Sequence, residues 1–228
     1  MGYRNRKNGV YKKNLKDRSK KTKQTRNKQA TIKLFREAAE RLLSEGGLKA
    51  LKINSLQKEA GKSKSLIYDY FGGIAGVLRD VLETTDIWLS YHGEIKSIIS
   101  KHYEDNGQSL AIMLLQEYFA RFSKDKLAQE ISLLELSKKR DRRLRELSES
   151  REHLGNELFN ISQKYFSGDV VSIRMVSALL LGGINYLVLH ANCNDSTFCG
   201  IDIKTDKDKD LMNKTLEQIV AWAYEHAA

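Results

Sequence analysis

Apolar residues recur at steps of three and four along most of the chain, which is the periodicity of amphipathic helices. The first such segment begins near residue 25, and its apolar face carries Ile32, Phe35, Ala39, Leu42 and Leu43. The pattern stops at Glu-Gly-Gly (45–47), where glycine can adopt the left-handed conformation that ends helices. Apart from residues 199–204, which could pair briefly, no segment alternates like a strand. The pattern therefore predicts an all-α fold.

Two short helices follow and are separated by a glycine. We expect the first of them to run from Asn54 to Ala60, with Asn54 as its N-cap. Gly61 then interrupts the chain, Ser63 is suited to cap a helix over residues 64–71, and Phe-Gly-Gly ends that helix. Three helices with a tight glycine-containing turn between the second and the third predict a helix-turn-helix unit.

The remaining sequence predicts long helices separated by polar loops. They cover residues 74–103, with a break near Gly93, and then 108–122, 126–139, 142–166, 170–191 and 209–226. About nine helices result, which is a small N-terminal helical domain followed by a larger one. The predicted organisation is a disordered arm over 1–24, a helix-turn-helix domain over 25–73 and a helical domain over 74–228.

The charge is concentrated at one end of the chain. The 228 residues carry a formal net charge of +10, yet residues 1–30 alone hold twelve Lys or Arg against one Asp, so the remainder is nearly neutral. A basic arm on a neutral body indicates a polyanionic partner, first nucleic acid and second an anionic membrane. A tail that merely increases solubility is the alternative. We expect the arm to be disordered until it meets its partner.

The third predicted helix has the features of a DNA-reading helix, which enters the major groove with its N-terminal turn leading. Residues 63–65 (Ser-Lys-Ser) occupy that turn and offer hydroxyl groups and an ammonium group to phosphates and base edges. Tyr68 and Tyr70 cannot both follow Ile67 and Phe71 into the core. At least one tyrosine should therefore face outward, where its hydroxyl group can bond a phosphate oxygen.

The segment Ala-Gly-Lys-Ser-Lys-Ser-Leu-Ile-Tyr-Asp-Tyr-Phe (60–71) resembles the DNA-binding domain of TetR-family transcription regulators. Phe35, the alanine pair 38–39, a glycine at 46 or 47 and Leu56 precede it at the family's spacing, and the resemblance covers about residues 26–80. It implies a cytoplasmic homodimer that reads a near-palindromic operator, a repressor released by a small molecule bound in its C-terminal domain. It also implies these DNA-facing positions: Lys52, Asn54, Ser63, Lys64, Ser65, Leu66, Tyr68 and Tyr70. Of the two tyrosines, the resemblance favours Tyr70 for the phosphate-facing role.

Several residues depart from the family pattern. Lys52 replaces a usual threonine, Leu66 favours contact with a thymine methyl group over hydrogen-bond readout, and Ile74 removes a frequent lysine. Asp69 adds a charge that would repel a phosphate. The arm can offset these losses, because each phosphate that it neutralises releases counterions. We therefore expect residues 4–28 to supply much of the affinity and little of the specificity, and such arms can also enter the minor groove.

The last two predicted long helices can each present a wide apolar face. The resemblance implies that they form a four-helix bundle with the same pair of a second subunit, although an ordinary intramolecular core would show the same pattern. The expected dimer seam comprises Met175, Leu179, Leu180, Gly183, Leu187, Ile219 and Ala223.

A ligand pocket is expected among the middle helices, where aromatic and polarisable side chains concentrate. The candidates are Trp88, Tyr91, His92, Met113, Tyr118, Phe122 and Tyr165. Glu117 and Glu135 lie among them, so the effector is expected to be mostly apolar and either aromatic or cationic. Each of these side chains could instead be ordinary core.

No other chemistry is predicted. Cys193 and Cys199 are separated by five residues in a polar loop, a poor zinc signature, and a redox role is the other alternative. HExxH, phosphate-loop and G-x-S-x-G motifs are missing, so neither an enzyme nor a cofactor nor a metal is expected. No apolar segment follows the basic arm, and the run 175–190 is short for a membrane span and contains Asn185. The rival interpretations are a non-specific nucleic-acid-binding architectural protein and a helical module that binds a metabolite without regulating DNA.

Overall fold

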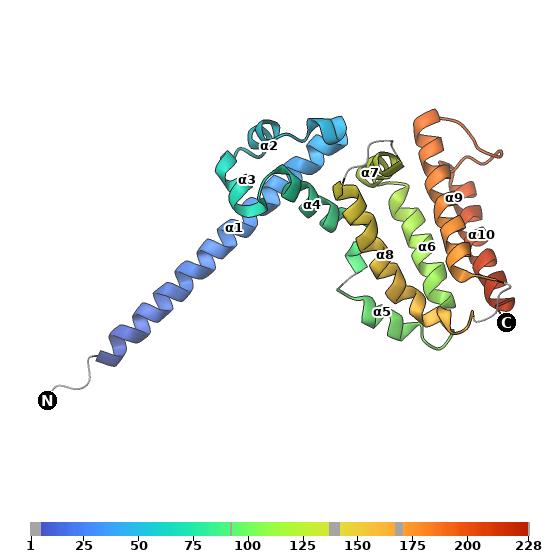
Figure 1. Cartoon of the computed structure of the whole chain (residues 1–228), viewed down its shortest axis with the longest axis horizontal. Helices are drawn as coiled ribbons and strands as arrows, with labels where there is room; N and C mark the ends of the chain where they lie inside the picture. Colours follow the sequence, from blue (N-terminus) through green and yellow to red (C-terminus); the bar gives the residue numbers. More distant parts are fainter. Residues whose placement is uncertain (1–5, 92, 137–141, 167–170, 228) are drawn as a thin grey trace. The chain divides into compact units, whose positions relative to one another are not determined.

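The computed structural model describes residues 6–91, 93–136, 142–166 and 171–227, and gives only the backbone for residues 6–24, 26 and 143. In these ranges the chain forms ten α-helices, one 3₁₀ helix and no strand (Figure 1). The all-α prediction is confirmed. The chain divides into two compact units, Met1–Val81 and Leu82–Ala228.

The N-terminal unit contains α1 (Arg6–Ala50), α2 (Ile53–Ala60), α3 (Lys64–Phe71) and the beginning of α4 (Ile74–Thr85). The helix α1 is kinked at Gly47, whose φ of 60° lies in the left-handed region, within the predicted stop. Arg36 of α1 pairs with Asp80 of α4, with Nε–Oδ2 and Nη2–Oδ1 distances of 2.7 and 3.0 Å. This contact explains why the unit extends past residue 73, where the sequence predicted a domain boundary.

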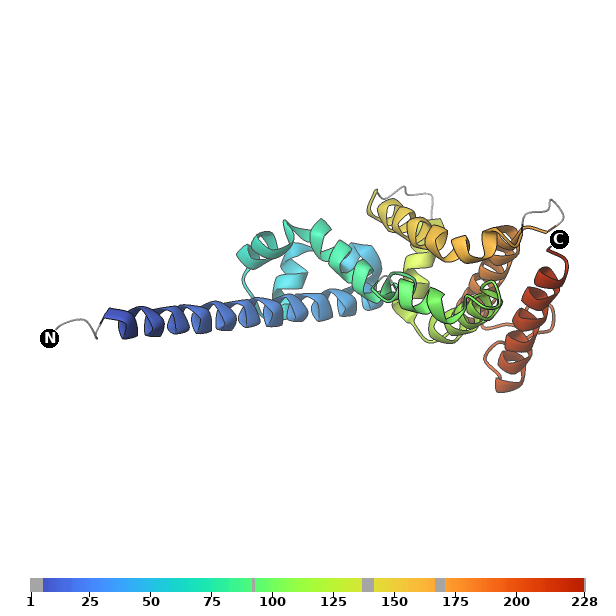
Figure 2. The ribbon, with the colours of Figure 1, turned by 90° about the horizontal axis from the view of Figure 1, so that it is seen from below.

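The backbone of α1 begins at Arg6, inside the segment that the sequence predicted to be disordered (Figure 2). Lysine, arginine and glutamine favour helices and the segment contains no proline, which explains the helical geometry. A highly charged helix is marginal in water on its own, so ordering of this arm on a polyanion stays a prediction.

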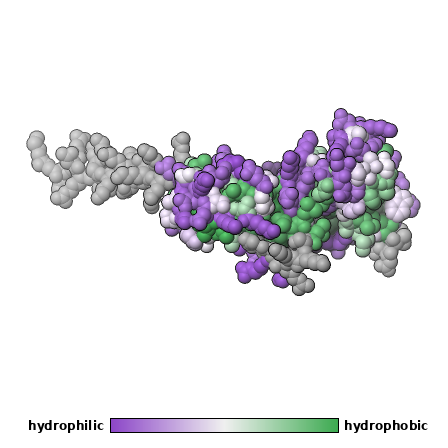
Figure 3. Space-filling view, turned by 90° about the horizontal axis from the view of Figure 1, so that it is seen from above, coloured by the Kyte–Doolittle hydropathy of each residue, from purple (hydrophilic) through white to green (hydrophobic). Residues whose placement is uncertain are grey.

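The C-terminal unit is a bundle built around α6 (Gln108–Phe122), which packs against α7 (Lys126–Leu136), α9 (Ile173–Asn194) and α10 (Asp206–Glu225). The helix α8 (Arg142–Gln163) contacts α7, α9 and the short α5 (Ile95–Lys101), so that α8, α6, α9 and α10 lie side by side (Figure 1). The core of the bundle contains Phe119, Phe122, Ile184, Val188, Leu216 and Val220. On the face drawn in Figure 3, apolar areas remain exposed between hydrophilic side chains of this unit.

The predicted helix 74–103 is interrupted earlier than Gly93. The Oδ1 atom of Asp86 accepts hydrogen bonds from the backbone N–H groups of Trp88 (3.0 Å) and Leu89 (2.9 Å). This local bonding competes with the helical pattern, so α4 ends at Thr85 and a 3₁₀ turn, η1 (Leu89–Tyr91), follows. Asp86 and Trp88 thereby enter the wall of the C-terminal bundle.

The helix α9 is long and apolar enough, by length and composition, to cross a membrane. The core helix of a soluble protein passes the same test. One side of α9 supplies Ile184, Val188 and Leu189 to the core, and its first turn carries the exposed Arg174. The packing is that of a bundle helix.

Candidate nucleic-acid interface and ligand pocket

Helix α2 begins after a residue in extended geometry and ends at a residue in left-handed geometry. Lys52, rather than Asn54, precedes the first turn of α2 with an extended backbone, and its carbonyl accepts from the N–H of Leu56 at 2.9 Å. Gly61 ends α2 in the left-handed region (φ 61°) with its N–H on the carbonyl of Gln57. The chain can then reverse within three residues and begin α3 at Lys64.

A small apolar core fixes the orientation of α3. Phe35, Leu56 and Ile67 are fully buried, and Phe71 packs edge-on against Phe35 with ring centroids 5.9 Å apart. Burial of one large apolar side chain from each helix stabilises the unit by about 1.5–3 kcal/mol per residue. Because Ile67 faces this core, the opposite side of α3 must face outward.

Six of the eight predicted DNA-facing residues are exposed, at the start of α2 and on the outward side of α3. Lys52, Asn54, Ser63, Lys64, Ser65 and Tyr68 are exposed, whereas Leu66 and Tyr70 are half-buried. Tyr68 is 55% exposed, while the ring of Tyr70 lies under the Nζ of Lys28 at 5.1 Å from its centroid. The structure therefore favours Tyr68 over Tyr70 as the freer phenol, although the resemblance favoured Tyr70.

The first turn of α3 has no side-chain cap. Ser63 is the N-cap residue, but its hydroxyl lies 2.9 Å from that of Ser65 and makes no bond to the backbone. The N–H groups at this end thus remain available to an external acceptor, where the helix dipole also favours an anion. The geometry suits a phosphate oxygen.

Two ion pairs connect the helices of the N-terminal unit. Arg41 of α1 binds Glu59 of α2 at 2.7 Å, and the Arg36–Asp80 pair ties α1 to α4. The pKa of Arg36 is raised, chiefly by its hydrogen bond to Asp80; burial opposes this rise, and the charges of Asp80 and Glu40 add to it. The guanidinium group is therefore charged throughout the physiological range and can hold the helices together.

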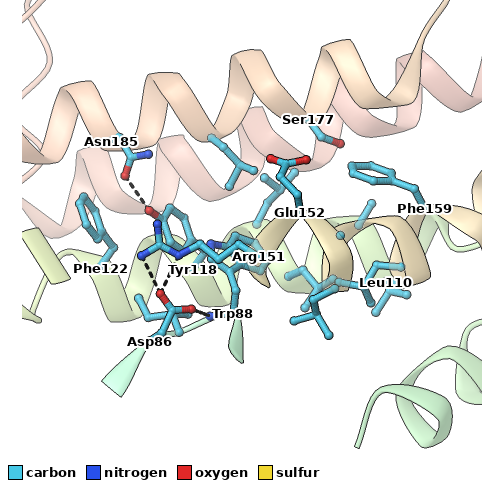
Figure 4. Close-up of a pocket in the computed structure, with 18 of the residues that line it drawn as sticks. Asp86, Trp88, Leu110, Tyr118, Phe122, Arg151, Glu152, Phe159, Ser177 and Asn185 are labelled. Carbon is cyan, nitrogen blue, oxygen red and sulfur yellow. Dashed lines mark hydrogen bonds and ion pairs between the residues drawn. The ribbon is translucent and has the colours of Figure 1, made fainter. Parts of the chain in front are cut away.

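The C-terminal unit encloses a cavity of about 370 Å³ between the residues that follow α4 and helices α6, α7, α8 and α9 (Figure 4). One wall is a stack of three aromatic rings. Trp88 stacks on Tyr118 at 4.9 Å and Tyr118 on Phe122 at 5.3 Å, measured between ring centroids. Apolar side chains such as Leu110 and Phe159 line the other end. A volume of this size suits a small organic ligand.

Tyr118 is fixed at its polar end. Its hydroxyl donates to the Oδ1 atom of Asn185 at 2.6 Å, and burial raises its pKa to about 12. The phenol is therefore neutral at physiological pH and adds no anionic charge to the cavity wall.

Arg151 of α8 forms a charged cluster beside this ring. Its Nε and Nη2 atoms contact Oδ2 of Asp86 at 2.7 and 2.6 Å, and Nη1 contacts both oxygens of Glu135 at 2.8 and 2.9 Å. Although burial lowers the pKa of Arg151, the charges of Asp86 and Glu135 raise it above its ordinary value. The guanidinium group is charged and bonded on both of its edges.

The predicted pocket residues are only partly brought together. Trp88, Tyr118 and Phe122 line the cavity, and Tyr91, Met113 and Tyr165 do not. Tyr165 instead stacks on Tyr224 at 5.6 Å. His92 lies outside the described residues.

The sequence interpretation missed the role of Arg151 and Asn185. Arg151 follows Leu147 by four positions and precedes Leu154 by three, so a charge inside the apolar stripe of α8 was the available signal. Asn185 was noticed as a polar interruption of an apolar run, but not as a lining residue. Asp86 had no sequence signal of this kind.

The predicted dimer seam divides into exposed, half-buried and buried positions. Met175, Leu179 and Gly183 are exposed, and Leu180, Leu187 and Ile219 are half-buried. Ala223 is fully buried within its own unit, so its side chain belongs to the intramolecular core. Exposed Tyr186 on α9 and Leu211 and Trp222 on α10 add apolar surface that the prediction did not include.

The remaining candidates show no site. Cys193 and Cys199 are exposed free thiols, and no group of three metal-binding side chains occurs in the part of the chain that the structure describes.

Residues 35–81 match the family described as bacterial regulatory proteins, tetR family. No curated protein sequence matches the chain. Solved structures that share its fold include three that cover most of its length. A transcriptional regulator FadR from Bacillus subtilis, solved in complex with stearoyl-CoA, is 17% identical with a TM-score of 0.55, over 82% of this chain and 97% of that chain.

The second similar structure is NalD, the secondary repressor of the MexAB-OprM multidrug efflux pump in Pseudomonas aeruginosa. It is 16% identical with a TM-score of 0.56, over 86% of this chain and 96% of that chain. The third is a TetR family transcription regulator from Marinobacter aquaeolei. It is 16% identical with a TM-score of 0.54, over 86% of this chain and 97% of that chain. At these identities the likeness shows the fold alone.

Proposed function

We propose that this chain is a transcription regulator of the TetR family, and that it is a sequence-specific repressor released by a small molecule. The match of residues 35–81 to the family and the likeness of the fold to solved regulators support the proposal. The observation that carries the proposal is the exposed N-terminal turn of α3. Ser63, Lys64 and Ser65 lie there on a helix that the buried Ile67 holds in one orientation. Such a turn can enter the major groove while Tyr68 and the N–H groups bind phosphates.

The cavity beside Arg151 is the proposed effector site. Asp86 lines this cavity and directly follows α4, which ends at Thr85. Helix α4 in turn follows α2 and α3 along the chain. A ligand that binds beside Asp86 can therefore act on α4 directly. One of the similar regulators was solved with stearoyl-CoA, which makes a long-chain acyl compound one class of effector to test. Regulators of this type act in the cytoplasm, which is the proposed location.

The function is tested by selecting bound duplexes from random DNA, with and without a cell extract. We expect a near-palindromic consensus with half-sites about one helical turn apart, and loss of binding when the effector is present. The alternative with an observation in its favour is non-specific nucleic-acid binding through the basic arm. A selection that enriches no sequence would contradict the regulator and support that alternative.

We also propose that the exposed apolar residues of α9 and α10 pair two subunits. Met175 and Leu179 on α9 and Trp222 on α10 are 62%, 69% and 50% exposed, on helices that pack against each other. Two copies of the reading unit are needed because one helix-turn-helix covers only a half-site. An apolar face of this kind is typical of protein–protein interfaces.

Replacing Leu179 by arginine should weaken the dimer. The substitution introduces a charge twice into a two-fold interface, so we expect the dimer dissociation constant to rise about tenfold or more. Light scattering after gel filtration at several concentrations measures it. The matched control is Leu136→Arg, at a residue of α7 that is 79% exposed and lies outside the proposed face. If both variants raise the dimer dissociation constant equally, or if neither does, this face is not the dimer interface.

Removing residues 1–24 should weaken binding to any duplex. The deletion removes ten Lys or Arg and one Asp. We expect affinity for specific and random DNA to fall by a similar factor, about tenfold or more, and the salt dependence between about 50 and 200 mM to become shallower. Fluorescence anisotropy titrations measure both quantities. An unchanged slope would show that the arm does not neutralise phosphates.

A further inference from the structure

The cavity of the C-terminal unit has an excess of negative charge. Among the described residues that line it, the charged ones are Asp86, Glu135, Arg151 and Glu152, three carboxylates against one guanidinium. Arg151 is already engaged, because four contacts of 2.6–2.9 Å bind it to the carboxylates of Asp86 and Glu135. The single positive group is therefore unavailable to an anionic ligand unless one of these bonds breaks.

Glu152 carries the unneutralised charge. It follows Arg151 on α8, and Figure 4 shows its carboxylate pointing from α8 toward α9, on the side of Ser177. Among the residues that the structure describes, Glu152 has no hydrogen-bond or ion-pair partner. The wall of the cavity thus carries a solvent-exposed carboxylate that no described cation neutralises, on the side of the Ser177 hydroxyl.

The aromatic wall of the cavity, like the carboxylate of Glu152, favours a positively charged ligand. Tyr118 is the middle ring of the stack, so the outer face of Trp88 at its end is the one that can attract a cation lying within about 6 Å of the ring centroid. Tyr118 remains neutral, so it adds no anionic charge of its own. The rings and Glu152 therefore favour the same sign of ligand charge, while Leu110 and Phe159 offer a surface for an apolar tail.

We infer that the cavity selects an amphipathic organic cation, an ammonium or comparable head group joined to an apolar body, over a carboxylate of the same size. A cation can place its head group near Glu152 and the outer ring face of Trp88 without disturbing the Arg151 cluster. An anion would meet net negative charge in a partly desolvated site, where electrostatic interactions are stronger than in water. This inference rests on the proposed function only for the regulatory role of the ligand, and not for its binding.

Isothermal titration calorimetry with the full chain tests the inference using three probes that share one tail: decyltrimethylammonium, decanol and decanoate. We expect the cation to bind about tenfold or more tightly than decanoate and more tightly than decanol. Glu152→Gln should weaken binding of the cation several-fold and leave decanol unchanged. The matched control is Glu157→Gln, because Glu157 is an exposed residue of α8 outside the cavity lining.

The outcomes separate the two proposals. Equal or tighter binding of decanoate, no binding of the cation, or equal effects of Glu152→Gln and Glu157→Gln would overturn the charge selectivity. If the cation binds as expected but selected operator DNA is not released, the selectivity stands and the repressor mechanism fails. If decanoate binds more tightly and releases the operator, the repressor mechanism stands and the selectivity fails.

Discussion

Arg151→Met is expected to lower the free energy of unfolding of the C-terminal unit by about 3–5 kcal/mol. The substitution keeps most of the side-chain volume and removes the charge. It leaves the carboxylate of Asp86, whose side chain is only 4% exposed, without its cation, and Glu135 loses the same partner. Urea denaturation followed by circular dichroism measures the change, and the fall in stability should be smaller at acidic pH, where protonation removes the unpaired charges.

The control for this prediction is Arg145→Met on the same helix. Arg145 pairs with Glu149 at 3.0 Å, but the two side chains are 78% and 58% exposed, so the expected loss is under about 1 kcal/mol. A triple variant that also carries Asp86→Asn and Glu135→Gln should recover part of the lost stability, because it removes both uncompensated charges. Similar losses for Arg151→Met and Arg145→Met would show that the cluster does not stabilise the bundle.

The sequence predicted the N-terminal unit well because its signals are local. Gly61 and Gly72 end helices at positions where both adopt left-handed geometry, and Ile67 lies on the apolar side of α3. These features need only the neighbouring residues, so periodicity and glycine positions locate them. The TetR resemblance and the all-α class follow from the same short stretches.

The cavity could be predicted only in part because its parts come from distant segments. Asp86 and Arg151 are 65 positions apart, and neither forms its cluster by helix periodicity. Tyr118 and Asn185 are 67 positions apart and meet through the packing of α6 on α9. The aromatic residues that the sequence suggested for the pocket include Trp88, Tyr118 and Phe122, which do line the cavity. They also include Tyr165, which belongs to a separate stack with Tyr224, and the sequence does not distinguish the two cases.

The exposed side of α3 leads to the second large prediction. Replacing Lys64 and Tyr68 together by alanine should weaken binding to the selected operator about 100-fold, since each lost contact to DNA costs roughly 1–3 kcal/mol. Both side chains are exposed, so the fold of the N-terminal unit should survive. Competition titrations of operator and random duplexes, together with a thermal melt of each variant, measure the effect.

The ratio of the two affinities identifies the role of α3. Binding to random DNA should fall much less than binding to the operator, because the basic residues 4–28 remain in place to neutralise phosphates. Lys96→Ala removes the same charge from an exposed site on α5 in the other unit and should leave the ratio unchanged. If the double variant weakens both duplexes equally, α3 contributes charge alone, and sequence discrimination must come from another surface of the protein.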